Sequence, residues 1–472
     1  MDAESTNIDQ RPLHPQAEHA TQNKFSILKN KLFIPLNILF IVLIVAGAGV
    51  SLFLSFQNRT TSKEKQTEKI RPTESYSYPT PLPQLKASNS SDAKGKIAFV
   101  SEGEIWTINS DGTNKKQITN DENNKFHISI SSDGKKIAYG FYPKDEKKRT
   151  NEGYYVGYNS GLAIHNLDLK ETKTLIPYSP IQNHYPLWSH DNKYVSVWVG
   201  NGIGSRLIDV SSGSDILNLK GSENNYVSPI VWVPKTDKVN FIENKNLIIS
   251  NIDGSNKQIL ATEVDSLRKV HEGPNVPQPP VWSQSGRYVA FYKSGDLHLM
   301  DAINKTDVIV EKRSKDEMFS QNYPQAYPVG LSSDEAKLYL FDSAKEKDTV
   351  VLDIKTGQMQ EIAKLGQSLI MSPDKENLLG RTYDTGQEIV VINLKDNSRR
   401  ECNGSFDYSY YSWAGGTGYA FRYDTWSPDS KGILGYKDHG DQGLNILNVR
   451  DCSIFNLITA KNIDSGNAIW FP

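Results

Sequence analysis

The chain ends in a segment that resembles a strand without the partner strand that should follow it. The final residues 466–472, GNAIWFP, match the start of a unit that recurs in the interior, as PLWS at 186–189 and PVWS at 280–283. In each complete unit a second strand soon follows. At the C-terminus it is missing, while a lone second strand, GKIAFV, stands at 95–100. A tail that supplies what the head lacks is most simply explained by a closed ring, so the sequence predicts a β-propeller whose last strand completes the first blade.

Eight such units align between residues 95 and 472, at about 47 residues per unit, a length typical of four-stranded blades. The first-strand position is apolar in every unit: Ile130, Trp188, Trp232, Trp282, Leu331, Met371, Trp426 and Trp470. The third strands end in a polar residue at one matched position: Asn109, Asn166, Asp209, Asn251, Asp301, Asp353, Asn393 and Asn448. We expect these polar side chains to bond the next tight turn and not a metal, because equivalent positions spread around a ring cannot converge on one ion. The predicted fold class is all-β, an eight-bladed β-propeller closed by the C-terminal strand.

The turn after the first strand carries a family resemblance. The segment WSPDSK at 426–431 resembles the TolB-type propeller repeat, whose blades contain W-S-P-D-G-x-x-I-A-F, and WVPK at 232–235 matches it loosely. The resemblance covers residues 95–472, although TolB itself has six blades and a helical domain in front. Eight blades behind an N-terminal anchor look more like the propeller half of the dipeptidyl peptidase IV family. In that family an α/β-hydrolase domain follows the ring, and this sequence ends where that domain would begin.

One N-terminal segment breaks the globular pattern. Residues 32–56 contain no charged side chain and are long enough to cross a bilayer with some tilt. The run is longer than the apolar core of a cleavable signal and follows a polar stretch, so we expect an uncleaved transmembrane helix behind a cytoplasmic tail, residues 1–31. Residues 57–94, rich in Ser, Thr, Lys and Pro, would form a flexible linker to the propeller at 95–472.

The orientation of this anchor does not follow from charge alone. Basic residues stand on both sides of the span: Lys24, Lys29 and Lys31 before it, and Arg59, Lys63, Lys65, Lys69 and Arg71 after it. By the positive-inside rule this count would leave the propeller in the cytoplasm. The rule is weak for long translocated domains, and the family resemblance implies the opposite side. We therefore expect a single-pass protein of the cell membrane with an extracytoplasmic propeller.

Composition excludes one class of partner. A nucleic-acid partner would need a basic face, and the formal net charge of −2 gives no reason to expect one, so we expect no such partner. The two cysteines, Cys402 and Cys452, fall on the outer strands of neighbouring blades. Outer strands splay apart, so we expect these cysteines not to form a disulfide, and without a C-x-x-C motif we expect no redox or metal chemistry from them.

Motifs for catalysis are absent from the sequence. The nearest match to the G-x-S-x-G nucleophile elbow, YYSWAGG at 410–416, lacks the first glycine and sits between repeats. The GNGIG segment at 200–204 falls between two strands, with no helix to receive a phosphate. The nine histidines show no metal-ligand spacing. We expect no catalytic residue, no metal and no cofactor.

A binding surface is the feature that remains. The long connections fall in the two classes that share one face of a propeller: 141–160, 177–185, 261–278, 312–327 and 403–423. The last of them holds eight aromatic residues and Arg422. Exposed aromatic side chains can stack on sugars or grip a peptide, and the alternative is a packed lid over the end of the ring. The candidate ligand-binding residues are Tyr154, Tyr155, Tyr185, Tyr408, Tyr411, Trp413 and Arg422.

These features predict a membrane-anchored, extracytoplasmic, non-catalytic module that binds or scaffolds a protein, a peptide or an envelope glycan. Two other classes stay open. A propeller enzyme of the lyase or glycosidase type would place acid and base residues at the channel mouth, as a carboxylate pair with a raised pKa. A ligand sensor would pass occupancy of its site through the anchor to residues 1–31.

Overall fold

The computed structural model describes residues 86–472 with internal gaps at 145–149, 152–153, 156–159, 180–182, 200–203, 223–226, 266, 269–275, 278–279, 312–325, 343–347, 366–368, 383–388, 403–406, 409–424, 437–442 and 460–462. Within these residues, no helix is long and apolar enough to cross a membrane. The predicted span 32–56 lies outside them and stays a prediction.

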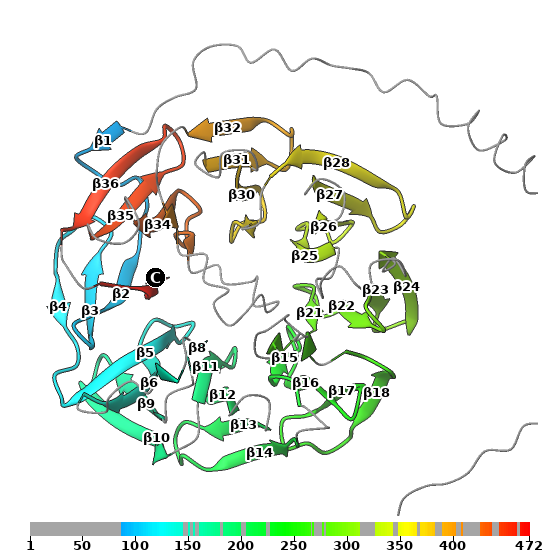
Figure 1. Cartoon of the computed structure of the whole chain (residues 1–472), viewed down its shortest axis with the longest axis horizontal. Helices are drawn as coiled ribbons and strands as arrows, with labels where there is room; N and C mark the ends of the chain where they lie inside the picture. Colours follow the sequence, from blue (N-terminus) through cyan, green and yellow to red (C-terminus); the bar gives the residue numbers. More distant parts are fainter. Residues whose placement is uncertain are drawn as a thin grey trace, which may run out of the picture. The chain divides into compact units, whose positions relative to one another are not determined.

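The described residues form eight sheets arranged as the blades of a propeller (Figure 1), which confirms the predicted all-β architecture. From the inner to the outer strand, the first four blades are β37 (Ile463–Phe471), β2 (Lys96–Ser101), β3 (Glu104–Asn109) and β4 (Lys116–Gln117); β5 (Asn123–Ile130), β6 (Lys136–Pro143), β9 (Ser160–Asn166) and β10 (Glu171–Ser179); β11 (Asn183–Trp188), β12 (Tyr194–Val199), β13 (Gly204–Asp209) and β14 (Asp215–Lys220); β15 (Val231–Trp232), β16 (Lys238–Glu243), β17 (Asn246–Asn251) and β18 (Gln258–Ala261).

The last four blades follow the same order. They are β21 (Val281–Trp282), β22 (Tyr288–Lys293), β23 (Asp296–Asp301) and β24 (Thr306–Glu311); β25 (Ala326–Leu331), β26 (Lys337–Asp342), β27 (Asp348–Asp353) and β28 (Met359–Lys364); β29 (Ile370–Met371), β30 (Asn377–Arg381), β31 (Ile389–Asn393) and β32 (Arg399–Cys402); β33 (Asp407–Tyr408), β34 (Gly432–Tyr436), β35 (Leu444–Asn448) and β36 (Ser453–Ile458). Two short hairpins lie outside the blades: β7 (Thr150–Asn151) with β8 (Tyr154–Tyr155), and β19 (Leu267–Arg268) with β20 (Val276–Pro277).

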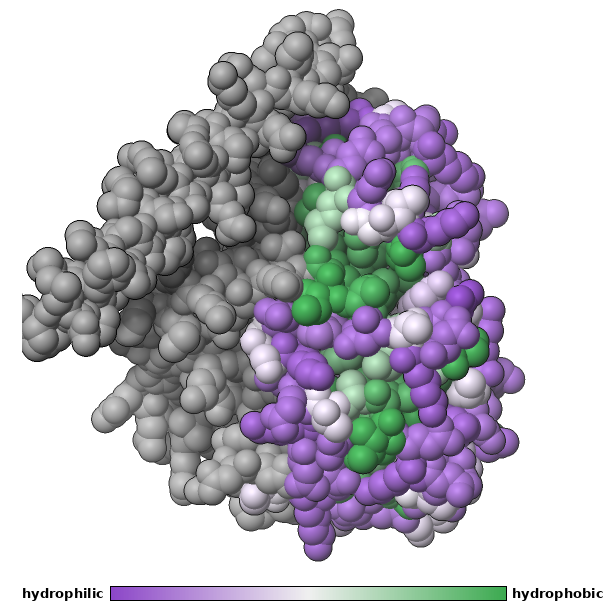
Figure 2. Space-filling view, turned by 90° about the vertical axis from the view of Figure 1, so that its right-hand side faces the viewer, coloured by the Kyte–Doolittle hydropathy of each residue, from purple (hydrophilic) through white to green (hydrophobic). Residues whose placement is uncertain are grey.

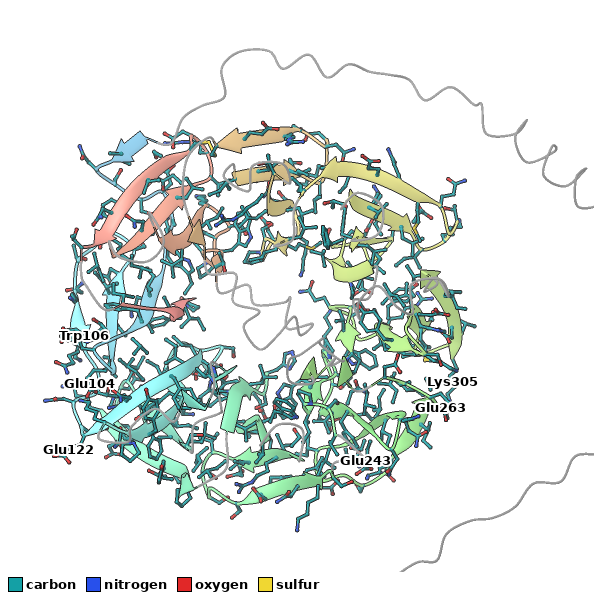
Figure 3. The ribbon with its side chains drawn as sticks, viewed as in Figure 1. Glu104, Trp106, Glu122, Glu243, Glu263 and Lys305 are labelled. Atoms are coloured by element: carbon teal, nitrogen blue, oxygen red, sulfur yellow. A yellow bond between two sulfur atoms is a disulfide. The ribbon has the colours of Figure 1, made fainter. Side chains whose placement is uncertain are left out.

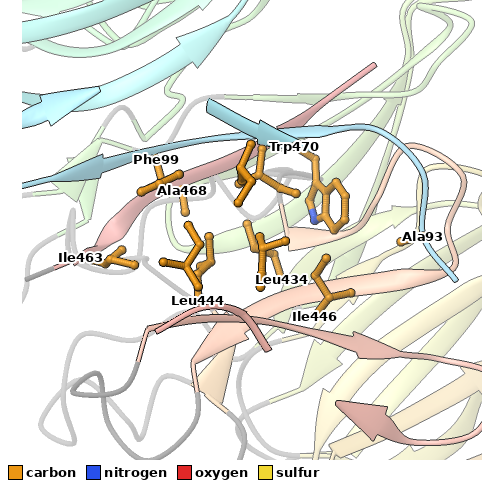
Figure 4. Close-up of a cluster of buried hydrophobic side chains, with 12 residues drawn as sticks. Ala93, Phe99, Leu434, Leu444, Ile446, Ile463, Ala468 and Trp470 are labelled. Atoms are coloured by element: carbon orange, nitrogen blue, oxygen red, sulfur yellow. The ribbon is translucent and has the colours of Figure 1, made fainter. Parts of the chain in front are cut away.

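The C-terminal strand closes the ring as the sequence predicts. β37 pairs antiparallel with β2, with Phe471 opposite Lys96 and Trp470 opposite Ile97. The Trp470 side chain is 6% exposed. It packs in a hydrophobic cluster that joins blade 1 to blade 8 and includes Phe99 and Leu434 (Figure 4). The core of the ring consists of such clusters between neighbouring blades, because each sheet buries one face against the next blade.

Seven of the predicted first-strand residues lie on innermost strands, and Trp426 forms an isolated bridge to Ile433 of the second strand in blade 8. Three of the tryptophans bond the preceding blade. The indole Nε1 donors and their acceptors are Trp188 to Ser129 O at 3.2 Å, Trp282 to Asn240 Oδ1 at 3.1 Å, and Trp426 to Ile370 O at 3.4 Å. The repeated tryptophan therefore combines a large buried surface with a directed contact between blades.

The matched polar residues end the third strands and bond the turns, as predicted. Asn166 Oδ1 accepts from the backbone N–H of Asp168 at 3.0 Å, and Asp353 Oδ1 accepts from Thr356 N–H at 2.8 Å. Blade 8 uses the same position differently. Asn448 Oδ1 accepts from the backbone N–H of Asp92, so this residue bonds the segment that leads into the propeller.

That segment adds a fifth strand to blade 8. β1 (Lys86–Ser88) pairs parallel with β36, with Lys86 opposite Ser453 and Ser88 opposite Phe455. Arg450 forms an ion pair with Asp92 at 3.1 Å, and Asp429 Oδ2 accepts from Lys94 N–H at 3.2 Å. The end of the predicted linker is therefore fixed along the outer edge of blade 8 before the chain enters blade 1.

The expectation for the cysteines is wrong. Cys402 and Cys452 form a disulfide with their Cα atoms 5.5 Å apart, and both residues are fully buried. Cys452 lies in the turn before β36, and this turn reaches back to blade 7, where Arg400 Nη1 donates to Val449 O at 2.6 Å. The splay of the outer strands does not separate the two residues because the contact comes from a turn. Cross-links of this kind, here 50 residues apart, stabilise a fold by about 4 kcal/mol in the chain-entropy account.

If Trp470 closes the ring, shortening its side chain should lower the stability of the protein strongly. Trp470→Ala leaves a cavity in the cluster between blades 1 and 8 and should lower the free energy of unfolding by about 3–5 kcal/mol. Chemical denaturation of the purified protein measures this loss. Leu169→Ala is the control, since Leu169 is 64% exposed and its loss should be nearly neutral. An unchanged midpoint for Trp470→Ala would contradict closure by the tail.

Candidate functional site

The antiparallel order of the blades defines two faces of the ring. Connections from second to third strands, and from each outer strand to the next blade, lie on one face, which we call the insertion face. The short connections from first to second and from third to fourth strands lie on the other, the turn face. The long connections predicted from the sequence all belong to the insertion face. β1 begins, at Lys86, beside the turn that precedes β36, and so next to the turn face.

The two longest insertions in blades 5 and 8 arise within the innermost strand, where the register jumps. In blade 3 the step is small, from His184 opposite Trp198 to Leu187 opposite Ser196. In blade 8 the inner strand advances from Tyr408, opposite Gly435, to Trp426, opposite Ile433. Blades 2, 3 and 6 carry a one-residue bulge at this place, and blade 8 carries a long insertion.

Blade 5 shows the same arrangement. Val264 bridges to Lys293, and pairing resumes only at Val281, opposite Ala290. We expected the segments 261–278 and 403–423 to connect neighbouring blades, and this expectation is wrong. The innermost strand of each blade is already paired with its second strand before the insertion begins. The physical consequence is that both insertions start from the inner wall of the ring and not from its rim.

The structure places some of the predicted binding residues on this face. Tyr154 and Tyr155 form β8, in the connection between β6 and β9. Tyr185 lies in β11, and Tyr408 lies in β33 at the point where the blade 8 insertion starts. The other three, Tyr411, Trp413 and Arg422, lie outside the described residues. All seven remain predictions as ligand contacts.

A buried charged cluster on the insertion face joins blades 1 and 2. The Lys125 side chain is fully buried, and its Nζ donates to Glu104 Oε2 at 2.8 Å, to Asp121 Oδ1 at 2.5 Å and to Asn123 O at 2.7 Å. Lys144 Nζ, on the exposed side, donates to Glu104 Oε1 at 2.6 Å. Figure 3 shows Glu104 on the blade 1 side of this boundary. Sequence reasoning missed this cluster, because its members share no motif and no repeat position.

The protonation states favour a structural role for the cluster. Burial acts to raise the pKa of Glu104, but hydrogen bonds from Lys125, Lys144 and Thr119 outweigh burial and hold the pKa below its usual value. The three donor positions of the Lys125 ammonium all have acceptors, so this lysine has no free position for a substrate. The cluster is a clamp between the first two blades.

The described carboxyl groups with resolved shifts all have lowered pKa values: Glu104, Asp111, Asp121, Asp133, Asp191, Asp209, Asp253, Asp301, Asp334, Asp353 and Asp396. An acid kept protonated by its surroundings would need the opposite shift. For most of them the cause is a hydrogen bond within a turn, as for Asp353 with Thr356. These carboxylates serve the repeated turns.

Two described histidines, His165 and His298, have partners within their own sheets. His165 Nδ1 lies 2.9 Å from Thr172 Oγ1, and burial lowers the pKa of His165. His298 Nδ1 lies 2.9 Å from Asp307 Oδ2, and its ring stacks on Phe291 with centroids 5.5 Å apart. In the part of the chain that the structure describes, no group of His, Cys, Asp and Glu side chains could hold a metal ion.

Comparisons with known proteins agree on the fold. No family model matches the sequence, and no curated protein matches it. The dihydro-heme d1 dehydrogenase NirN in complex with DHE is similar in structure, with 12% identity, a TM-score of 0.50 and coverage of 82% of this chain and 78% of that one. TolB from Acinetobacter baumannii is another structural neighbour, with 12% identity, a TM-score of 0.33 and coverage of 66% of this chain and 65% of that one.

A third neighbour is an oligogalacturonate lyase in complex with manganese, with 13% identity, a TM-score of 0.40 and coverage of 76% of this chain and 89% of that one. At such identities the likeness shows the propeller fold alone.

The charged clamp predicts a specific loss of stability. Lys125→Met leaves the Glu104 carboxylate buried with one lysine fewer and should cost about 3–5 kcal/mol in unfolding free energy. Lys144→Met is the matched control and should cost less than about 1 kcal/mol, because the Lys144 side chain is 40% exposed. The folded pKa of Glu104 lies below 4.5, so its contribution is present above pH 4.5 and is lost as the pH falls through the folded value. Denaturation between pH 7 and pH 3 measures both effects, and equal losses for the two variants would contradict the clamp.

Proposed function

We propose that the protein is a membrane-anchored, extracytoplasmic propeller that binds a protein, a peptide or an envelope glycan on its insertion face, without catalysis. The observation that carries the proposal is the origin of the blade 8 insertion on the inner wall of the ring, between Tyr408 and Trp426. Its sequence supplies rigid aromatic side chains together with Arg422, a fork of donors suited to carboxylate or phosphate. Binding through aromatic anchors around a rigid ring needs no enzyme chemistry.

The base of this insertion is held firmly on both sides. Cys402 precedes β33, and Trp426 follows the insertion; both are buried in one cluster with Cys452. The disulfide and the indole therefore fix the two ends of the insertion to blades 7 and 8. A loop with fixed ends loses less conformational entropy when it binds, which favours affinity.

The disulfide also supports the proposed compartment. Disulfides form and persist in oxidising surroundings and are rare in reducing cytosol, and both cysteines of this chain are used in one. The predicted span at 32–56 would anchor the ring. The described part of the chain begins at Lys86, which lies beside the turn face and not the insertion face.

Removal of the aromatic side chains should abolish binding without unfolding the ring. The triple variant Tyr408→Ser, Tyr411→Ser and Trp413→Ser should lose capture of the partner that wild-type protein retains from envelope extract and on glycan and peptide arrays. The melting temperature should stay nearly unchanged. Leu169→Ser is the control and should retain capture, because Leu169 is exposed in the turn between β9 and β10, on the turn face and outside the candidate residues. Retained capture with a fall in stability of several kcal/mol would show a packed lid and contradict the proposal.

The proposed topology has its own test. Protease added to intact cells should cleave the linker between residues 57 and 85 and release the propeller, because a coil of this composition is an accessible substrate. The readout is immunoblotting for an epitope tag at each end of the chain. Complete protection of the propeller in intact cells, with digestion after lysis, would place the ring in the cytoplasm.

A further inference from the structure

The turn before β36 contains a cysteine at a position that other blades leave accessible to solvent. In six blades the fourth residue after the matched polar residue adopts the left-handed conformation, with φ between 53° and 81°: Lys170, Gly213, Lys305, Gly357, Asn397 and Cys452. Of these six residues, Cys452 alone is fully buried. Figure 2, seen from the side of blades 4 to 6, shows hydrophobic surface only in separate areas within a hydrophilic surround. Blade 8 therefore buries a turn residue that other blades expose.

This turn position lies next to the outer strand of the preceding blade. In blade 3, a Cβ atom added to Gly213 would lie 3.9 Å from Leu175 Cδ2, which belongs to β10 of blade 2. In blade 8 the equivalent contact brings Cys452 against Cys402, the last residue of β32 in blade 7. The repeat itself therefore places the two cysteines together.

Noncovalent bonds also hold the two cysteines in this arrangement. Arg400, two residues before Cys402, donates from Nη1 to Val449 O at 2.6 Å, and Val449 belongs to the turn that contains Cys452. Within that turn, the backbone N–H of Cys452 donates to Asn448 O at 3.1 Å. These contacts do not involve sulfur, so the fold can bring the two thiols side by side before the covalent bond forms.

The disulfide restrains a conformation that a cysteine rarely adopts. A residue other than glycine with φ near 59° costs free energy, and such a conformation persists only where the surrounding structure fixes it. The bond also lies in the hydrophobic cluster that contains Trp426 and Ile433. We call this cluster, with β32 and the turn before β36, the blade 7–8 junction. Without the bond, the turn could relax and the junction would open more often, although Cys402 and Trp426 flank the insertion.

We propose that Cys402 and Cys452 form a redox lock at the blade 7–8 junction. In the thiol form the ring is closed and the junction opens readily, and oxidation fixes the junction and with it both ends of the insertion. The inference rests on the proposed function, because it assigns regulation to that binding site. Thiols persist in the reducing compartment where a chain is synthesised, and disulfides form after export. Binding would therefore begin only after export.

The oxidant is a small or protein disulfide, such as oxidised glutathione. One cysteine thiolate attacks the glutathione disulfide, forms a mixed disulfide and releases one glutathione thiolate. The second cysteine thiolate then displaces the other glutathione thiolate and closes the bond. Two electrons pass from the cysteine sulfurs to the oxidant, and the two protons lost by the cysteines are taken up by the two glutathione thiolates. Both cysteines are fully buried, so the exchange needs a local opening, which the closed lock then opposes.

Hydrogen exchange tests the lock in the full-length chain in mild detergent. Protein isolated with its thiols reduced is compared with the same protein after oxidation by glutathione disulfide. Peptides that contain Ile433 and Leu447, two buried members of the cluster, should exchange at least about tenfold faster in the thiol form. Peptides from β16 in blade 4 should exchange at equal rates. Equal protection of the junction in both forms, or an equal loss of protection in every blade, would overturn the proposal.

Two substitutions separate the covalent bond from the backbone conformation. Cys452→Ala removes the bond and keeps a residue that disfavours the left-handed conformation, whereas Cys452→Gly removes both restraints on the turn. Exchange at the junction should be fastest in Cys452→Ala, slower in Cys452→Gly and slowest in the oxidised wild type. Lys170→Ala is the matched control, because it changes the same turn position in blade 2, where no cross-link exists. A junction as protected in Cys452→Ala as in the oxidised wild type would refute the lock.

Glycan and peptide arrays separate this inference from the proposed function. The oxidised form should bind, and the thiol form and Cys452→Ala should bind the same array members at least about tenfold more weakly. Equal binding by the oxidised and thiol forms would overturn the redox control and leave the proposed function standing. Binding by neither form would count against the proposed function and against the control that rests on it.

Discussion

The pairing of β37 with β2 is the interaction on which the rest of the ring depends. Each blade buries its faces only against its two neighbours, so an open ring would expose two blade interfaces and one inner strand at once. The contact pairs Lys96 with Phe471, two residues far apart in the described chain. Bringing them together costs conformational entropy, and the packing between blades 1 and 8 must offset that cost. Trp470 provides that packing, since its buried indole belongs to the cluster between blades 1 and 8.

The same junction is fixed a second time from the N-terminal side. Asn448 bonds the backbone at Ser90 and Asp92, and Asp429 bonds the backbone of Lys94, so the entry segment is held by blade 8 before it becomes blade 1. On the far side of blade 8, the disulfide joins it to blade 7. Both borders of this blade are thus held by more than the repeated hydrophobic packing. It is also the blade whose inner strand carries the aromatic insertion.

Much of the fold could be predicted because its determinants are local and repeated. The residue at the Trp426 position is apolar in each unit for the same reason, and Asn166 or Asp353 is polar because the adjacent turn needs a bond. The disulfide was not predictable in this way, since it depends on the turn before β36 reaching back to blade 7. The ion pair between Lys125 and Glu104 could not be predicted from the sequence either, because a single buried ion pair between blades produces no repeated pattern.

The point at which the aromatic insertion begins could not be predicted from the sequence. The sequence shows a long aromatic segment between two strands of the repeat, and this pattern predicts a connection between blades. The register shows instead that Tyr408 is already paired with Gly435 on the inner strand. An insertion that starts there takes its position from the wall of the ring, which the disulfide and Trp426 hold in place. Fixed ends lower the conformational entropy that a segment can lose on binding, which is why the proposed function places recognition at this insertion.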